Sequence, residues 1–156
     1  MRVCVDTAIF IDILKDEFRP FQEIFYSALS ANERLVIPVI VLAELLPQFG
    51  GDAKLTASFL KDHKIQTDPL DLEGVTVAAQ RWIDYLKIKI KTKCPDCGCS
   101  LSQREHLLSD FFIGGFALTK CDAILTRDRG IYRNYFPDLK GYGDCLREKI
   151  GYPGNK

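Results

Sequence analysis

The chain alternates between short apolar runs and longer stretches in which apolar residues recur at helical spacing. Apolar runs occur at residues 3–5, 35–37 and within 122–126, and a weaker run occurs at 65–67. Runs that are apolar at consecutive positions are typical of strands buried on both faces of a parallel sheet. The pattern therefore predicts four strands in the body of the chain, and the tail offers one further edge strand.

Between these runs, apolar residues repeat every three or four positions, which predicts helices that bury one face. The predicted helices cover a segment that starts after Asp6, then residues 19–32, 39–48, 53–63, 72–89 and 103–119, and a short turn at 131–135. Asp52 and Asp71 suit N-caps. Pro38 suits the first position of the third helix, where its missing N–H costs nothing.

Strands that alternate with helices predict a mostly parallel sheet with right-handed connections and helices on both faces. The length of 156 residues suits one domain with a real core. We therefore expect a single α/β domain over residues 1–156. The one compositional break is a Cys-rich insert at about residues 91–106. Gly114 and Gly115 inside a helix cost about 1 kcal/mol each relative to Ala, which suggests close backbone packing against the sheet.

Charge and cysteine usage narrow the functional classes. The formal net charge is zero, so no global basic field indicates nucleic acid, although a local basic patch stays open. Asp6 and Asp12 interrupt the apolar start, which therefore does not read as a secretory signal, and no apolar run is long enough to span a bilayer. We expect a cytoplasmic protein with no membrane association, whose six cysteines are mainly reduced thiols.

Four acids stand at positions that favour a shared site. Asp6 and Asp128 follow predicted strands, whereas Glu44 and Asp110 lie on apolar helices that must pack on the same sheet. Ligands of open α/β sheets bind at the carboxyl ends of the strands. Four carboxylates at that edge would repel one another, and binding a divalent cation would make them tolerable. An oxygen-only cluster selects Mg²⁺ or Mn²⁺.

Each of these acids also has a structural explanation. Asp6 suits a helix cap, and Asp110 is a candidate N-cap with the preceding serine. Glu44 suits an ion pair with a distant Arg or Lys, and Asp128 suits a polar turn. Asp12 is a conceivable further acid of the site, but a solvated helix face is the favoured interpretation.

The sequence around the four acids resembles a known family. The matching pieces are VDTAIFID around Asp6, VIVLAELL around Glu44, SDFFIGGFAL around Asp110 and ILTRDRGIYRNYFPDL around Asp128. Over nearly the whole chain the sequence resembles the PIN domain family, most closely the VapC-type toxin ribonucleases. The resemblance implies a three-layer α/β/α sandwich with a central parallel sheet of about five strands.

The resemblance also implies a function, namely a Mg²⁺- or Mn²⁺-dependent endoribonuclease that hydrolyses RNA phosphodiester bonds. The four acids match the family's metal ligands, and Thr126 matches the hydroxyl residue beside them. The chain offers no Ser–His or Cys–His pair as a nucleophile, and metal-activated water needs only carboxylates. Arg127, Arg129 and Arg133 are candidates to hold flanking phosphates, with ordinary surface charge as the alternative.

The Cys-rich insert carries half of a zinc knuckle. Cys94 and Cys97 have the C-x₂-C spacing of zinc ligands, and Cys99 and His106 are the nearest residues that could complete a four-ligand structural site. The alternatives are a loop of free thiols, a disulfide formed on oxidation, or a site lost from a longer ribbon. Bound zinc would hold the loop in place and take no part in catalysis.

Three functional interpretations follow. The first is the toxin of a toxin–antitoxin pair, an RNA-cleaving enzyme held inactive by a small antitoxin. The second is a non-catalytic RNA- or protein-binding module that uses the PIN fold and the zinc-knuckle loop, and the third is a housekeeping RNA-processing nuclease. A homodimer is common in the family, and Phe10, Phe21 and Phe25 supply either apolar surface for it or core.

Overall fold

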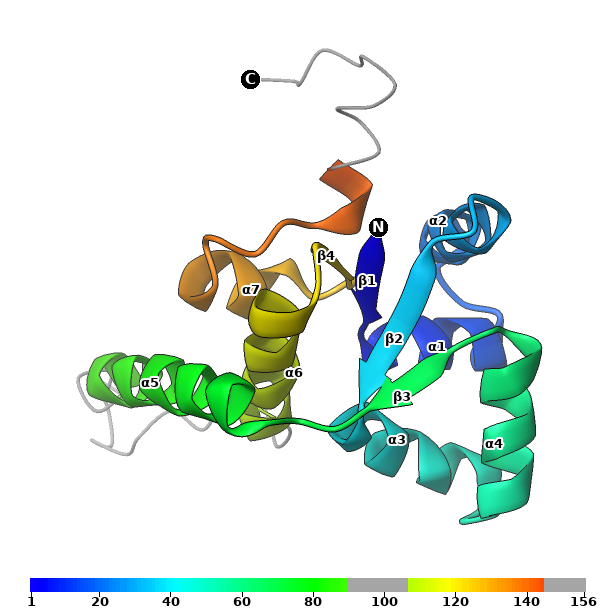
Figure 1. Ribbon diagram of the computed structural model, residues 1–156, viewed down its shortest axis with the longest axis horizontal. Helices are drawn as coiled ribbons and strands as arrows, with labels where there is room; N and C mark the ends of the chain where they lie inside the picture. The colour runs from blue at the N-terminus through cyan, green and yellow to red at the C-terminus, as the bar shows by residue number, and fades with distance from the viewer. Residues whose placement is uncertain (90–106, 145–156) are drawn as a thin grey trace, which may run out of the picture.

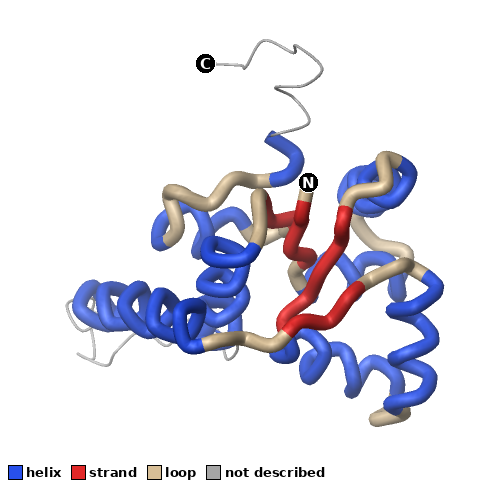
Figure 2. Tube along the Cα trace, in the orientation of Figure 1, coloured by secondary structure: helices blue, strands red, loops and turns tan. Residues whose placement is uncertain are grey.

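A four-stranded parallel sheet forms the centre of the fold. The computed structural model describes residues 1–89 and 107–144 (Figures 1 and 2). The strands are β1 (Arg2–Val5), β2 (Arg34–Pro38), β3 (Gln66–Asp68) and β4 (Ala123–Leu125). They pair in parallel in the order β3-β2-β1-β4, so β1 lies between β2 and β4. The four predicted strands are confirmed. Beyond β4, the described residues add an isolated bridge between Ile124 and Gly141 in place of a fifth strand.

The helices cover both faces of this sheet. They are α1 (Thr7–Lys15), α2 (Arg19–Ser30), α3 (Val39–Leu45), α4 (Ala53–Asp62), α5 (Leu72–Lys89), α6 (Leu107–Lys120) and α7 (Arg129–Tyr135), with a 3₁₀ turn at η1 (Leu46–Phe49). In Figure 1, α5, α6 and α7 lie on one side of β1 and β2, and α2 and α4 lie on the other side. The predicted three-layer α/β/α sandwich is confirmed.

The predicted third helix, residues 39–48, is shorter in the structure, and two prolines mark its limits. Pro38 ends β2, where it pairs with Asp68, and takes the N-cap of α3 with an extended backbone, so it is not the first helical residue. Pro47 has no N–H to donate to a carbonyl one turn earlier. The α-helix accordingly ends at Leu45, and the chain continues as the η1 turn.

Two aromatic clusters fill the layers between helices and sheet. On one side, Phe10 of α1 lies edge-on to Phe25 of α2 and to Phe59 of α4, at centroid distances of 5.9 and 6.1 Å. On the other side, Phe111 of α6 lies 5.2 Å from Trp82 of α5. Because Phe10 and Phe25 have no exposed surface, they belong to the core and cannot form the apolar dimer surface considered above.

The glycine pair in α6 does reflect close packing, but the neighbour differs from the one predicted. A Cβ on Gly115 would lie 2.3 Å from the backbone oxygen of Gly74 and 3.0 Å from Cβ of Ala78, both on α5. A Cβ on Gly114 would lie 2.6 Å from the ring of Phe136. The absent side chains thus let α6 approach α5 and the Phe136 ring rather than the sheet.

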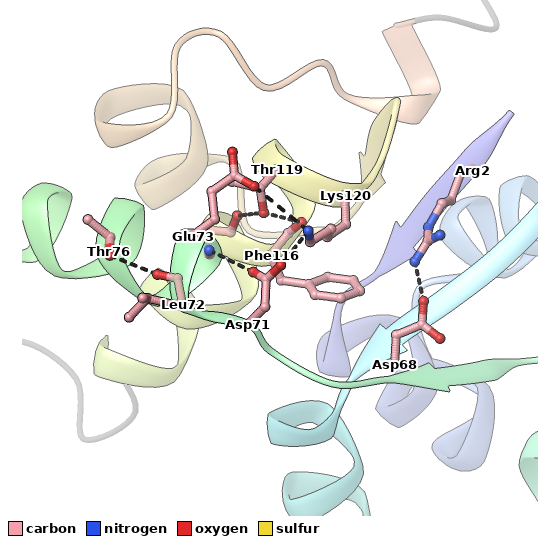
Figure 3. A network of polar contacts seen from close by, with 11 residues as sticks. Arg2, Asp68, Asp71, Leu72, Glu73, Thr76, Phe116, Thr119 and Lys120 are labelled. Atoms are coloured by element: carbon pink, nitrogen blue, oxygen red, sulfur yellow. Dashed lines mark hydrogen bonds and ion pairs between the residues drawn. The ribbon is translucent and has the colours of Figure 1, made fainter.

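Polar contacts fasten α5 to α6 at the start of α5 (Figure 3). Asp71 accepts a 3.0 Å hydrogen bond from the backbone N–H of Gly74, which confirms the predicted cap. Its carboxylate also pairs with Lys120 in the last turn of α6. A separate ion pair joins Arg2 of β1 to Asp68 of β3.

Two further expectations concern thiols and membranes. Among the described residues, Cys4 and Cys121 are free thiols. Across residues 1–89 and 107–144, no helix combines the length and the hydropathy that crossing a lipid bilayer requires.

Candidate functional site

The four predicted acids line one pocket of about 880 Å³. Asp6 follows β1, Asp128 follows the turn after β4, Glu44 lies on α3 and Asp110 lies in the first turn of α6. Since β1 and β4 are parallel neighbours, their carboxyl ends bring the first two acids to the same edge. The four acids thus meet at this edge of the sheet as part of the lining of one pocket.

Asp6 is the most deeply placed of the four, with 4% of its surface exposed. Its backbone takes the N-cap position of α1, where its carbonyl accepts from the N–H of Ile9 at 3.1 Å, but its carboxylate makes no capping hydrogen bond. The carboxylate instead accepts from the Thr126 hydroxyl at 2.5 Å. Burial raises the pKa of Asp6 to about 6; the Thr126 hydrogen bond opposes the rise, and the carboxylates of Glu44 and Asp128 add to it.

Thr126 and Asp128 organise the turn that leaves β4. The Thr126 hydroxyl accepts from the backbone N–H of Asp128 at 3.0 Å. Asp128 accepts through Oδ1 from the N–H of Gly130 at 3.0 Å, and so caps α7 while it lines the pocket. Thr126 itself borders a neighbouring pocket of about 500 Å³, and its contact with the acidic pocket is the hydrogen bond to Asp6.

Glu44 differs from the expectation of a carboxylate buried among apolar neighbours. It is half-exposed on the pocket side of α3, and it accepts a hydrogen bond from the hydroxyl of Thr7. In the described part of the chain, its carboxylate thus hydrogen-bonds to a neutral hydroxyl, whereas the alternative considered above was an ion pair with a distant Arg or Lys. Thr7 is a site residue that was not predicted, and its place directly after Asp6 was the available signal.

The three arginine candidates have separate positions. Arg127 lines the acidic pocket, whereas Arg133 is exposed on α7 and borders the neighbouring pocket. The side chain of Arg129 lies outside the described residues. Of the two arginines whose side chains are described, Arg127 is the one that lies beside the acids.

The prediction that Asp12 lies on a solvated helix face is wrong, because the residue is completely buried. Its Oδ1 lies 3.3 Å from Nη1 of Arg127. Burial raises the pKa of Asp12, and the Arg127 guanidinium opposes that rise. The available signal was the sequence around it, where Ile11 and Ile13 flank the acid.

The chemistry of the pocket fits a divalent cation. Carboxylate oxygens from Asp6, Glu44, Asp110 and Asp128 form a hard donor set. Burial first, and the charges of Glu44 and Asp128 second, raise the pKa of Asp6, and a bound cation would offset both penalties on its ionised form. Within residues 1–89 and 107–144, however, no three carboxylate, imidazole or thiol groups already stand close enough to hold an ion. The zinc candidates Cys94, Cys97, Cys99 and His106 lie outside the described residues.

Comparison with known proteins places this geometry in context. A family model for the PIN domain matches residues 3–137. Two similar solved structures are VapBC2 from Rickettsia felis bound to a DNA fragment from their promoter, and DNA-bound VapBC from Salmonella typhimurium. The first has a TM-score of 0.63 and 14% identity, the second a TM-score of 0.60 and 17% identity, and each alignment covers 90% of this chain and 96% of the other. A search of curated proteins found no match.

Proposed function

The chain belongs to the PIN domain family, and from that premise we propose that it is a Mg²⁺- or Mn²⁺-dependent endoribonuclease that hydrolyses RNA phosphodiester bonds. PIN domains are generally nucleases and typically use these metals. The observation that carries the proposal is the meeting of Asp6, Glu44, Asp110 and Asp128 in one pocket. A chain that had lost catalysis would have no need to retain all four.

In the proposed reaction, the four acids hold the metal, and neighbouring hydroxyls orient two of them. Thr126 fixes the carboxylate of Asp6, and Thr7 fixes that of Glu44. A bound Mg²⁺ or Mn²⁺ would supply an activated water and offset charge on the scissile phosphate. Among the described residues that line the pocket, Arg127 is the one with a cationic side chain, and it would bind a phosphate oxygen of the substrate.

The first prediction concerns substrate and metal. Purified protein should cleave defined single-stranded RNAs when Mn²⁺ or Mg²⁺ is added and should stop when EDTA is added in excess. DNA of the same sequence should be cut far more slowly if the 2′-hydroxyl is part of recognition. Product lengths resolved on a denaturing gel measure both rates. The absence of metal-dependent cleavage across a broad RNA panel would contradict the proposal.

We further propose that the enzyme is the toxin of a toxin–antitoxin pair acting in the cytoplasm, as one domain over residues 1–156 with the Cys-rich insert. The support is the fold shared with chains of the two VapBC structures. A homodimer stays part of the proposal, with an interface that excludes Phe10 and Phe25.

The second prediction tests the antitoxin. The product of a short gene directly upstream, co-expressed with this chain, should co-purify with it and suppress RNA cleavage. The measurement is the rate of cleavage with and without the upstream product at equal nuclease concentration. Unchanged cleavage with a co-purified partner, or no co-purification with any adjacent small protein, would favour a housekeeping nuclease.

A further inference from the structure

An exposed phenylalanine lies on the wall of the acidic pocket, at a position that ordinarily favours a small polar residue. Phe18 lines the pocket with 55% of its surface exposed. Its backbone is left-handed, with φ of 48°, which is rare for a bulky residue. It takes the N-cap position of α2, where small polar residues are preferred, and its side chain makes no capping hydrogen bond. Neither burial nor capping therefore explains Phe18.

The turn that presents Phe18 is nevertheless held firmly. Gln22 donates from Nε2 to the carbonyl oxygens of Asp12 at 3.0 Å and Glu17 at 2.7 Å. Asp16, two residues before Phe18, is also left-handed, with φ of 51°. Strained backbone that the surroundings fix in place is a feature of functional sites, where it pre-sets the position of a side chain.

Arg127 links this ring to the acids. Its guanidinium carbon lies 4.0 Å from the centroid of the Phe18 ring, a cation–π contact. Its Nη1 faces the buried Asp12, neither of whose carboxylate oxygens has a hydrogen-bond partner in the described structure. Arg127 is thus held between a buried charge and an aromatic face, and it still lines the pocket.

We propose that Phe18 and Arg127 form a nucleotide subsite beside the acids, in which an unpaired base of single-stranded RNA stacks on Phe18 and Arg127 meets the adjoining phosphate. The inference rests on the proposed nuclease function and narrows its substrate to RNA that is unpaired at this position. Aromatic side chains bind bases of any sequence through their π-faces. Bases within a duplex are already stacked on their neighbours and cannot reach the ring.

The test compares variants of Phe18 in the full-length Asp110→Asn chain, in which the substrate should stay intact. Fluorescence anisotropy gives the affinity for short single-stranded RNAs, for the same RNAs with one abasic position moved along the strand, and for the matching duplex. Phe18→Ala and Phe18→Leu should each weaken single-strand binding about tenfold or more, because both lack a π-face. Phe18→Trp should restore it, and its added indole fluorescence should be quenched by single-stranded RNA but not by duplex.

Tyr26 supplies the matched control. It is an aromatic residue on α2, the helix that begins directly after Phe18, and it is 45% exposed and absent from the pocket wall, so Tyr26→Ala should leave RNA affinity unchanged. One abasic position should abolish the difference between wild-type Phe18 and Phe18→Ala, which locates the stacked base. Thermal unfolding of each variant shows that the fold persists.

The outcomes separate this inference from the proposed function. If the wild-type protein cleaves RNA, and Phe18→Ala cleaves and binds RNA as well as the wild type, the proposed subsite is wrong and the proposed nuclease function stands. If the chain does not cleave RNA but the introduced indole is quenched by single strands, the nuclease is wrong and the subsite stands. A Phe18→Ala variant that loses a protein partner and keeps its RNA affinity would assign the ring to a protein interface and overturn the inference.

Discussion

Replacing Asp110 by asparagine is expected to lower Mn²⁺-dependent RNA cleavage by at least about a hundredfold, because the proposed metal site loses one of its four carboxylates. Loss of a residue that merely supports a metal ligand costs roughly 10- to 100-fold in affinity or activity, and loss of a ligand should cost more. Asparagine has nearly the same shape as aspartate, and Asp110 is only half-buried in the first turn of α6. The fold should therefore persist.

Asp62→Asn is the matched control for this experiment. Asp62 is an exposed acid at the end of α4, outside the pocket, and its replacement removes the same charge. Initial rates on one labelled RNA, with circular dichroism of each variant, separate loss of chemistry from loss of fold. Full activity in purified Asp110→Asn would refute the assignment of this pocket, and activity retained by every acid variant would point to a contaminating nuclease.

The features of the site that could be predicted from the sequence are those that depend on local geometry. A strand that is buried on both faces must end at one sheet edge, so the positions of Asp6 and Asp128 followed from their places after apolar runs. The same logic located Glu44 and Asp110 on helices that pack near this edge. Parallel pairing of β1 with β4 then brought the acids into one pocket, as the structure shows.

The features that could not be predicted from the sequence are contacts between residues that are distant along the chain. Thr7 reaches Glu44 from 37 positions away, and Asp12 meets Arg127 from another element altogether. Periodicity says that a residue is on an apolar face, but it does not identify the residue opposite. Gly115 shows the same limit, because its lack of a side chain predicted a close approach without revealing that the neighbour is Gly74 of α5.

Electrostatics connect the pocket to the stability of the protein. A carboxylate with 4% exposure, close to two further acids, is costly to ionise without a cation. The Thr126 hydrogen bond reduces that cost but does not remove it, since the pKa of Asp6 stays raised at about 6. A pocket suited to bind a cation should therefore weaken the fold when the cation is removed.

Asp6→Asn should accordingly make the metal-free protein more stable at neutral pH while it abolishes metal-dependent cleavage. The ordinary pKa of 3.8 applies in the unfolded chain, so folded Asp6, with its pKa of about 6, binds its proton more tightly. Below about pH 4, Asp6 is protonated in both the folded and the unfolded state, so it does not change the free energy of unfolding. As the pH rises to about 6, that free energy falls by up to about 3 kcal/mol in the wild type, whereas asparagine has no proton to lose and causes no such fall. Urea unfolding in EDTA should show the variant's advantage growing from about pH 4 to about pH 6 and then staying level up to pH 7.5. Adding Mg²⁺ at pH 7.5 should raise the free energy of unfolding of the wild type more than that of Asp6→Asn. If the variant's advantage in EDTA is instead the same at every pH from 4 to 7.5, Asp6 does not have a raised pKa in the folded protein.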